Sequence, residues 1–214
     1  IRQALETEGK QWGEGLTRVY DAMAMDYLYG NVNNILLMLG NHDMDRIADV
    51  VKDQDPRRVK LANTLLATMR GIPQVFYGDE YAMKSADRRL GHSTLRMPLP
   101  LGEAVTEEMQ DMFDYQSRLF QWRKGEPVIH TGRTMHFMSR DNTYGFFRYN
   151  DSEAVFVFAN ASEENRTIPT ANYAEILGKY NPVGEDVITG KKYDLSQKDI
   201  VIPALSSIVV KLSK

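Results

Sequence analysis

The stretch LLMLGNHDMDRI, residues 36–47, joins an apolar run to a dense cluster of polar side chains. Five consecutive apolar residues over 35–39 predict a strand that is covered on both faces, as in a parallel sheet. After one glycine the chain continues with Asn41, His42 and Asp43. In α/β barrels and open α/β sheets, functional sites are built at the ends of such strands. The stretch therefore predicts an α/β fold with a candidate site immediately after the strand.

Helical patterns surround this strand on both sides. Apolar residues at helical spacing predict a helix over about 14–29, and a second helix over about 56–70 has Pro56 suited to its first turn. The apolar sequence IPQVFY, residues 72–77, predicts a second strand. Two parallel strands joined through a helix form a right-handed βαβ unit. The polar clusters that follow both strands are then expected at the same end of a sheet.

The sequence pattern changes toward the C-terminus. A long loop is expected over 84–102 and a third helix over about 103–123. Beyond this helix, short apolar runs flank turn residues, which predicts antiparallel strands. The clearest runs are 144–149, 154–159, 200–202 and 208–212. We therefore expect an α/β region over residues 1–125 and a small all-β sandwich over residues 126–214.

Composition excludes several classes of protein. Of the 214 residues, 43% are hydrophobic and 26% are charged, an ordinary globular balance. Lys and Arg number 26 against 29 Asp and Glu, so the sequence lacks the basic excess of a nucleic-acid-binding protein. The absence of cysteine excludes disulfides and thiolate metal sites, and no apolar run approaches the roughly 18 residues of a membrane span. Because the first residue is Ile1 rather than methionine, we expect a piece of a longer protein.

The polar cluster after the first strand admits three interpretations. Asn and Asp are frequent turn residues, so Asn41 and Asp43 could serve only to shape a turn. A zinc site is not favoured, because His42 has no second histidine at helical spacing. A carboxylate beside an imidazole and a guanidinium is suited to stabilising positive charge, as in the oxocarbenium-like transition state of glycoside cleavage. Arg46, three positions after Asp43, would keep that carboxylate ionised.

Four longer motifs extend the cluster into a resemblance. LGNHDMDRI (39–47) is followed by TLLATMRGIPQVFYGDEYAM (64–83), LRMPLP (95–100) and LFQWRKGEPVIHTG (119–132). Together they resemble the alpha-amylase family of glycoside hydrolases, family 13, and are most similar to its neopullulanase and cyclomaltodextrinase branch. The resemblance implies the C-terminal part of a (β/α)8 barrel, with the two predicted strands as barrel strands seven and eight. An antiparallel β-sandwich, called domain C in this family, would follow.

The resemblance also implies roles for the residues of the first motif. Asp43 matches the family's third catalytic carboxylate, which stabilises the transition state. His42 matches the histidine that hydrogen-bonds the sugar in the subsite being cleaved. Asn41 completes the motif, and its expected role is to hold the loop. Arg46 matches an arginine found after the motif in this branch and is expected to contact a sugar or Asp43.

The second strand brings further candidates. Tyr81 follows it and is the best placed aromatic residue for stacking on a sugar, although packing in a core or loop is the more common role of such residues. Asp79 and Glu80 fall in the family's motif after strand eight. We expect mainly structural roles for these two carboxylates, in capping and orienting the helix that follows.

The same resemblance predicts that the catalytic set is incomplete. The family's nucleophile and acid/base follow barrel strands four and five, upstream of these residues, and Glu6, Glu8 and Glu14 lie in no matching motif. We therefore expect the C-terminal part of a retaining α-glucan hydrolase of starch degradation, inactive by itself. Its substrates would contain the α-1,4 bonds of maltodextrins, cyclodextrins or pullulan. The alternative is a non-catalytic glucan-binding or structural module of the same superfamily.

Partners and cofactors follow from this reading. We expect an α-glucan substrate, no nucleic acid, no membrane span, no cofactor and no metal ligands in these residues. Any calcium site would depend on barrel loops that this sequence does not contain. Because two barrel strands cannot close a barrel, exposed strand edges predict self-association. The resemblance favours a periplasmic or extracellular setting over a cytoplasmic one.

Overall fold

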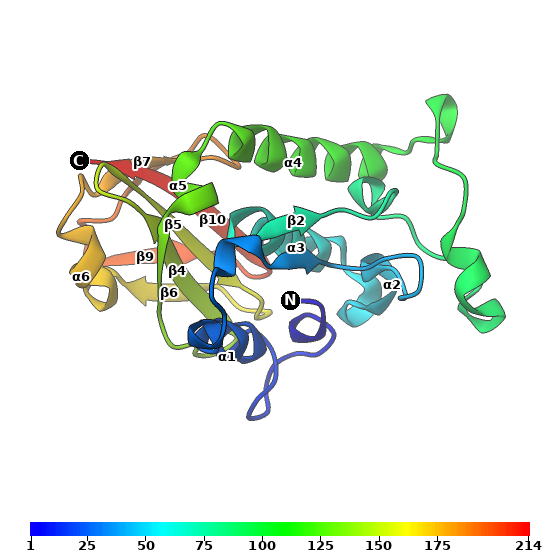
Figure 1. Cartoon of the computed structure of the whole chain (residues 1–214), viewed down its shortest axis with the longest axis horizontal. Coiled ribbons are helices and arrows are strands. Elements are labelled where there is room, and N and C mark those ends of the chain that lie inside the picture. Colours follow the sequence, from blue (N-terminus) through cyan, green and yellow to red (C-terminus); the bar gives the residue numbers. More distant parts are fainter.

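The protein is described by a computed structural model that covers residues 1–214, with the side chain of Arg88 outside the described part. It consists of a helical region with a short parallel sheet and a region of antiparallel strands, which lie against each other (Figure 1). The α-helices are α1 (Thr17–Ala24), α2 (Ile47–Val50), α3 (Pro56–Thr68), α4 (Glu107–Lys124), α5 (Pro127–Thr131) and α6 (Ala174–Leu177). Among the described residues, no helix combines the length and the apolar character needed to cross a membrane.

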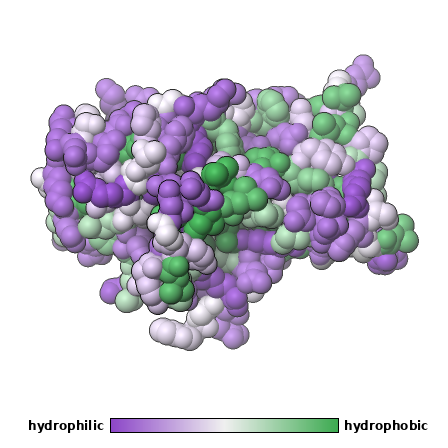
Figure 2. All heavy atoms as spheres, in the orientation of Figure 1, coloured by the Kyte–Doolittle hydropathy of each residue, from purple (hydrophilic) through white to green (hydrophobic). Residues whose placement is uncertain are grey.

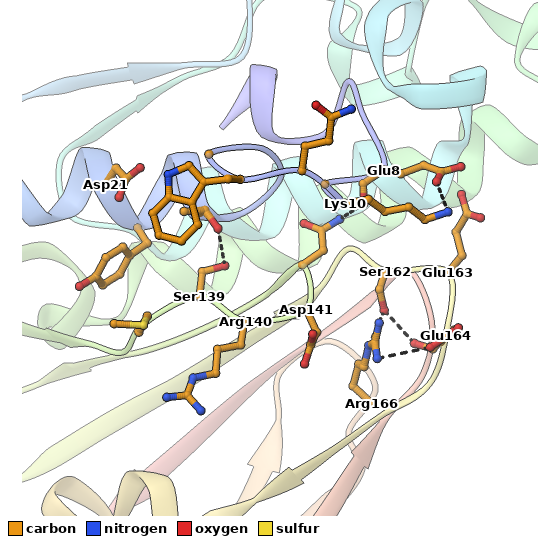
Figure 3. Close-up of a pocket in the computed structure, with 18 residues that line it drawn as sticks. Glu8, Lys10, Asp21, Ser139, Arg140, Asp141, Ser162, Glu163, Glu164 and Arg166 are labelled. Atoms are coloured by element: carbon orange, nitrogen blue, oxygen red, sulfur yellow. Dashed lines mark hydrogen bonds and ion pairs between the residues drawn. The ribbon is translucent and has the colours of Figure 1, made fainter.

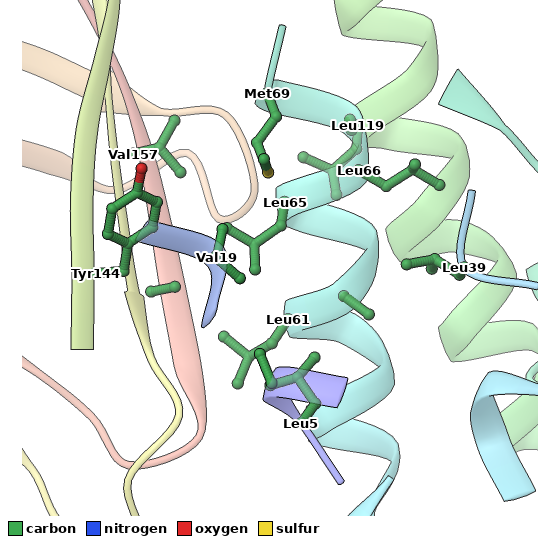
Figure 4. Close-up of a cluster of buried hydrophobic side chains, with 14 of the residues drawn as sticks. Leu5, Val19, Leu39, Leu61, Leu65, Leu66, Met69, Leu119, Tyr144 and Val157 are labelled. Atoms are coloured by element: carbon green, nitrogen blue, oxygen red, sulfur yellow. The ribbon is translucent and has the colours of Figure 1, made fainter. Parts of the chain in front are cut away.

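Helix α3 forms where the sequence predicts it. Pro56 occupies its first turn, and the Asp55 carboxylate accepts a hydrogen bond from the Arg57 N–H (2.9 Å), which caps the N-terminus. The helix is buried along most of its length because it lies between α4 and the antiparallel sheet (Figure 4). In that view Leu65 lies between Leu119 of α4 and Val157 of the sheet.

Other predicted helices differ at their ends. The helix expected over 14–29 begins at Thr17, and after Ala24 the chain continues as a separate 3-10 turn. Helix α4 begins four residues later than expected, where the Thr106 hydroxyl accepts a hydrogen bond from the Met109 N–H (3.2 Å). The 3-10 segments are Arg2–Ala4, Asp26–Leu28, Val32–Asn34, Lys52–Gln54, Asp79–Tyr81, Arg88–Leu95, Gly102–Ala104 and Thr170–Tyr173. Two of them lie wholly or partly in the region expected to be a long loop.

The two strands of the helical region are parallel, as expected. Strand β1 (Leu36–Met38) pairs with β2 (Ile72–Gln74), and α3 lies between them in the chain. The prediction that β1 is covered on both faces is wrong, because Leu36 is 49% exposed and Met38 is 37% exposed. The physical reason is that the described residues form a two-stranded sheet here. In this two-stranded sheet no further barrel strand covers the second face of β1. The expected exposure of the barrel edges is therefore confirmed.

The C-terminal region contains two antiparallel sheets. The larger sheet has the order β3-β4-β5-β10-β7-β8, and the smaller pairs β6 with β9. The predicted hairpin forms as β4 and β5, and the last two predicted strands form as β9 and β10 but pair with other strands. The strands are β3 (Arg133–His136), β4 (Thr143–Tyr149), β5 (Glu153–Asn160), β6 (Arg166–Pro169), β7 (Val183–Asp186), β8 (Lys192–Asp194), β9 (Asp199–Ile202) and β10 (Ser206–Ser213).

Strands β4 and β5 separate two parts of the hydrophobic core. Successive side chains of a strand point to opposite faces. Phe146 and Val157 therefore pack in the cluster that includes α3 and α4, whereas Phe147 and Phe156 pack beneath β9 and α6. The predicted domain boundary at residues 125 and 126 falls between α4 and α5, and the first cluster continues across it. The larger sheet thus supports the helical region from one side.

Candidate active site at the end of strand β1

The predicted site lies in a turn that follows β1. The side-chain oxygen Oδ1 of Asn41 accepts a hydrogen bond from the Asp43 N–H (2.8 Å), the geometry of a turn closed by an asparagine side chain. The side chains of His42 and Asp43 are 57% and 64% exposed. Asn41 thus has the loop-holding position that the sequence predicts, and it directs its two neighbours toward solvent.

Two basic side chains flank the Asp43 carboxylate. Nε2 of His42 lies 3.2 Å from Oδ2 of Asp43, and Nη2 of Arg96 lies 3.6 Å from Oδ1. Arg96 comes from the segment after the 3-10 stretch Arg88–Leu95, far from the turn in sequence. Arg96 lies in the motif LRMPLP, but its contact with Asp43 could not be predicted from the sequence, because the two residues are far apart along the chain. The carboxylate remains open to solvent between these two groups.

Arg46 does not occupy the place expected of it. The expectation that it contacts Asp43 or a sugar is wrong in this structure, because its side chain is buried and 1% exposed. Its guanidinium donates to the Tyr77 carbonyl (2.9 Å) and the Leu95 carbonyl (2.7 Å), and it lies 4.6 Å from the centre of the Phe76 ring. Arg46 therefore ties the loop after β2 and the segment carrying Arg96 to the turn that carries Asp43.

Asp79 is the charged partner of this buried guanidinium. Oδ1 of Asp79 lies 3.3 Å from Nη1 of Arg46, and Asp79 is 3% exposed. Burial raises the pKa of Asp79 to about 7, and it outweighs the opposite effect of Arg46. Glu80 accepts a hydrogen bond from the Gly78 N–H (2.7 Å). Both carboxylates thus stabilise the loop beneath the site, in a 3-10 turn rather than at the start of a long helix.

Tyr81 packs within the protein. Its ring stacks on Phe113 of α4, with the ring centres 5.2 Å apart and the planes inclined by 18°. One face of the phenol is therefore occupied, and the packing alternative describes this residue better than the expected sugar contact. The hydroxyl group of the neighbouring Tyr77 donates a hydrogen bond to the Met97 carbonyl (3.1 Å), which fixes the segment that follows Arg96.

A metal centre is not found within the described side chains. Among them, no three histidine, cysteine, aspartate or glutamate residues lie close enough together to hold an ion. His42, Asp43 and Arg96 lie together at the surface, each about half exposed or more.

The fold and the strand-end cluster define a class: the C-terminal part of a (β/α)8 barrel followed by an antiparallel β domain. A family model described as "Alpha amylase, catalytic domain" matches residues 4–167, and one described as "Cyclo-malto-dextrinase C-terminal domain" matches residues 134–211. The chain belongs to the alpha-amylase family. The neopullulanase and cyclomaltodextrinase resemblance agrees with the second model.

Curated relatives extend well beyond the matched region. The chain is 24% identical over 193 residues to a cyclomaltodextrin glucanotransferase of Geobacillus stearothermophilus, covering 83% of this chain and 24% of the relative. It is 26% identical to an alpha-amylase of Niallia circulans over 185 residues, covering 83% and 33%. The chain thus spans about a quarter to a third of the length of these relatives.

Solved structures confirm the fold. An alpha-amylase from Geobacillus thermoleovorans, complexed with acarbose, superposes with a TM-score of 0.77 at 20% identity, covering all of this chain and 46% of that one. A cyclic alpha-maltosyl-(1→6)-maltose hydrolase from Arthrobacter globiformis gives 0.70 at 20% identity, covering 98% and 42%. The barrel part and the sandwich are therefore arranged as in enzymes of this fold.

Proposed function

We propose that this chain supplies the C-terminal part of the catalytic unit of a retaining α-glucan hydrolase. The bonds cleaved are the α-1,4 linkages of maltodextrins, cyclodextrins or pullulan. The names of the relatives support this class of substrate, since they include an alpha-amylase and a cyclomaltodextrin glucanotransferase. The observation that carries the proposal is the open Asp43 carboxylate, held between His42 and Arg96 at the end of β1.

Asp43 acts in this proposal through its charge. In glycoside cleavage, positive charge develops on the anomeric carbon and ring oxygen of the sugar in the transition state. A carboxylate fixed in place before the reaction stabilises that charge without reorganisation. Arg96 and the Asn41 turn hold the carboxylate, and His42 offers a ring N–H to a hydroxyl of the same sugar. The substrate bond is broken by groups other than Asp43.

The nucleophile and the proton donor come from outside this chain. A retaining enzyme needs two carboxyl groups about 5–5.5 Å apart, one of them protonated. Glu8 does not suit the acid role, because hydrogen bonds from Lys10 and Lys52 lower its pKa to about 2. Glu6 is engaged by Arg2 at 3.3 Å. We therefore expect the isolated chain to be inactive. We also propose that no cofactor is required of its residues and that the complete enzyme acts on glucans outside the cytoplasm.

Two measurements test this proposal. The isolated chain, incubated with maltoheptaose, is expected to release no reducing sugar. In the product of the gene that includes the upstream coding sequence, Asp43→Asn is expected to lower kcat by roughly 10²- to 10³-fold, as removal of one preorganised electrostatic group does. Asp53→Asn, an exposed aspartate paired with Lys52, is the control and is expected to leave kcat unchanged.

Each outcome has a definite meaning. Hydrolysis by the isolated chain would contradict the assignment of the nucleophile and acid to other residues. Equal kcat values for the Asp43→Asn protein and the unsubstituted protein would contradict the role of Asp43. A fall in kcat for Asp53→Asn that matched the fall for Asp43→Asn would indicate a general loss of structure.

A further inference from the structure

A cavity lies away from the strand-end site, between the helical region and the larger sheet. It has a volume of about 750 Å³, within the range of small-molecule sites. Its walls come from the loop 8–13, helix α1, the turn 138–142 and the segment 162–166 (Figure 3). None of these segments includes the turn that carries Asp43. We refer to this cavity as the Trp12 cleft.

The walls of the Trp12 cleft are fixed to each other by Asn142. Its side-chain oxygen accepts a hydrogen bond from the Leu16 N–H (2.9 Å), and its amide group donates to the carbonyls of Glu8 (2.9 Å) and Ala161 (3.0 Å). One buried amide therefore joins three walls. Because these hydrogen bonds fix the walls relative to each other, a ligand would meet a cleft whose walls are already ordered.

Glycines let the loop approach Asn142 this closely. Gly9 and Gly15 both have positive φ, at 67° and 59°. A Cβ at Gly9 would lie 2.6 Å from the Asn142 side chain, and one at Gly15 would lie 2.3 Å from it. Both positions therefore require glycine for the backbone conformation and for the contact. The two glycines therefore specify the conformation of this loop.

Trp12 has no packing role in this loop. Its side chain is fully exposed, with a relative exposure of 101%. Met138, across the cleft, is 65% exposed. Tryptophan buries a large area when it is covered, so an uncovered indole at the edge of a preformed cavity provides a flat apolar surface for a ligand.

The polar lining of the cleft divides into two groups. Glu8, Glu163 and Arg166 take part in ion pairs with Lys10, Lys52, Arg58 or Glu164, which stabilise the walls. The guanidinium of Arg140 and the carboxylates of Asp21 and Asp141 form no hydrogen bond or ion pair with the described side chains. Donors and acceptors therefore remain available in the lining of the cleft.

The charges of the lining indicate the kind of ligand. Five carboxylates face three cationic side chains around the cleft, which disfavours phosphates, nucleic acids and other anions. A neutral sugar ring has an apolar face of C–H groups and a rim of hydroxyls. The face suits a flat aromatic surface, and the rim suits unpaired carboxylates and a guanidinium.

We propose that the Trp12 cleft binds a maltooligosaccharide. Trp12 stacks on one glucose ring, and Arg140 with Asp21 or Asp141 forms hydrogen bonds to hydroxyls of the same chain. The ligand class rests on the proposed function, because α-1,4-linked glucose is the substrate proposed above. The cleft would hold the glucan through domain C and α1, while the strand-end site acts on another part of the polymer.

Calorimetric titration of the 214-residue chain with maltoheptaose tests this proposal. Trp12→Ala is expected to weaken binding at least tenfold, which corresponds to about 1.4 kcal/mol. Arg140→Ala is expected to weaken binding in the same direction and serves as a second variant. Tyr27→Ala is the matched control, because Tyr27 is an aromatic residue that is 77% exposed and lies outside the cleft. This control is expected to bind as the unsubstituted chain does.

The remaining arms separate this proposal from the function of the strand-end site. Asp43→Asn in the 214-residue chain is the comparison variant for the strand-end site; if it abolishes maltoheptaose binding while Trp12→Ala does not, the Trp12 cleft is overturned. Absence of binding, or equal binding of cellohexaose, also overturns it. Hydrolysis by the longer gene product is measured separately. If the Trp12 cleft does not bind maltoheptaose, the proposed function is not affected. If Asp43→Asn does not lower kcat, the proposed function is contradicted, but the binding constant measured for the cleft remains valid.

Discussion

Arg46 illustrates how a residue near a site can serve it without facing it. Its position three residues after Asp43 allows contact with that carboxylate, yet its side chain turns inward and binds backbone carbonyls beneath the turn. A guanidinium has five N–H donors in a planar fork, so one arginine can hold several carbonyls at once. Arg96 takes the position beside Asp43 instead. Arg46 thus supports the loop, whereas Arg96 lies beside the Asp43 carboxylate.

Asp79, the partner of Arg46, makes stability depend on pH. Its folded-state pKa of about 7 lies above its ordinary value of 3.8. Between these values the folded state binds more protons than the unfolded state, so this residue makes the free energy of unfolding fall as pH rises from about 4 to about 7. The expected slope is on the order of 1 kcal/mol per pH unit in the steep part of this window. Urea unfolding at several pH values measures it.

Asp79→Asn is expected to remove this part of the slope, because an amide does not titrate. The overall stability of the variant also changes, because an amide replaces the carboxyl group beside the buried Arg46, and the slope is therefore the readout. Asp151→Asn is a suitable control, because that carboxylate is 96% exposed. A slope that persists in Asp79→Asn would show that another group titrates in this range.

At the scale of elements, the turn between β3 and β4 helps to tie the helical region to the larger sheet. The turn between β3 and β4 carries Asp141 and Asn142, both with positive φ, at 49° and 55°. Only Asn142 is buried, and it contacts the loop before α1 and the end of β5. Helix α1 is therefore held in place by a residue more than a hundred positions later in the sequence.

Asn142→Ala is expected to lower the free energy of unfolding by about 2–4 kcal/mol, since it removes three hydrogen bonds and leaves their partners unsatisfied. Part of the loss comes from placing alanine at positive φ, which costs roughly 1–2 kcal/mol. Asp141→Ala has the same backbone conformation without the hydrogen bonds and isolates that part. Chemical denaturation of both variants gives the difference, and equal losses would contradict the role assigned to the Asn142 amide.

At the scale of the whole molecule, the short parallel sheet leaves apolar side chains open to solvent. Figure 2 shows hydrophobic residues gathered near the centre of this face, where Figure 1 places β1. Among the large hydrophobic residues, Leu36 is 49% exposed, Ile72 is 51% exposed and Leu28 is 59% exposed. Exposed strands and apolar patches of this kind favour association with another chain.

The isolated chain is therefore expected to self-associate through β1 and β2. Size-exclusion chromatography with light scattering should give at least twice the monomer mass of 24.5 kDa at micromolar concentration. Leu36→Lys with Ile72→Lys should shift the protein toward monomer, because burying two lysines in an apolar interface is unfavourable. Leu101→Lys, at a site 77% exposed on another segment, is the control. A monodisperse monomer for the unsubstituted chain would contradict this prediction.

The parts predicted well from sequence are those where local signals agree. Helix α3 has a proline at its start, an aspartate cap and apolar residues at helical spacing, and the β4–β5 hairpin has turn residues between two apolar runs. The parts predicted poorly depend on neighbours that the pattern does not specify. The apolar run of β1 is the same whether other strands cover it or not, and the partners of β9 and β10 follow from packing of the two sheets.

The sequence by itself determined which residues form the candidate site, because Asn41, His42 and Asp43 are adjacent, and their motif resembles that of the alpha-amylase family, to which the chain belongs. It also determined the order of α1, β1, α3, β2 and α4, and the hairpin of β4 and β5. Only the tertiary structure decided which arginine faces Asp43, which carboxylate is buried with Arg46, and where Trp12 lies relative to the larger sheet. The physical reason is that these contacts join residues distant in the chain, and their distances and burial arise only when the elements pack together.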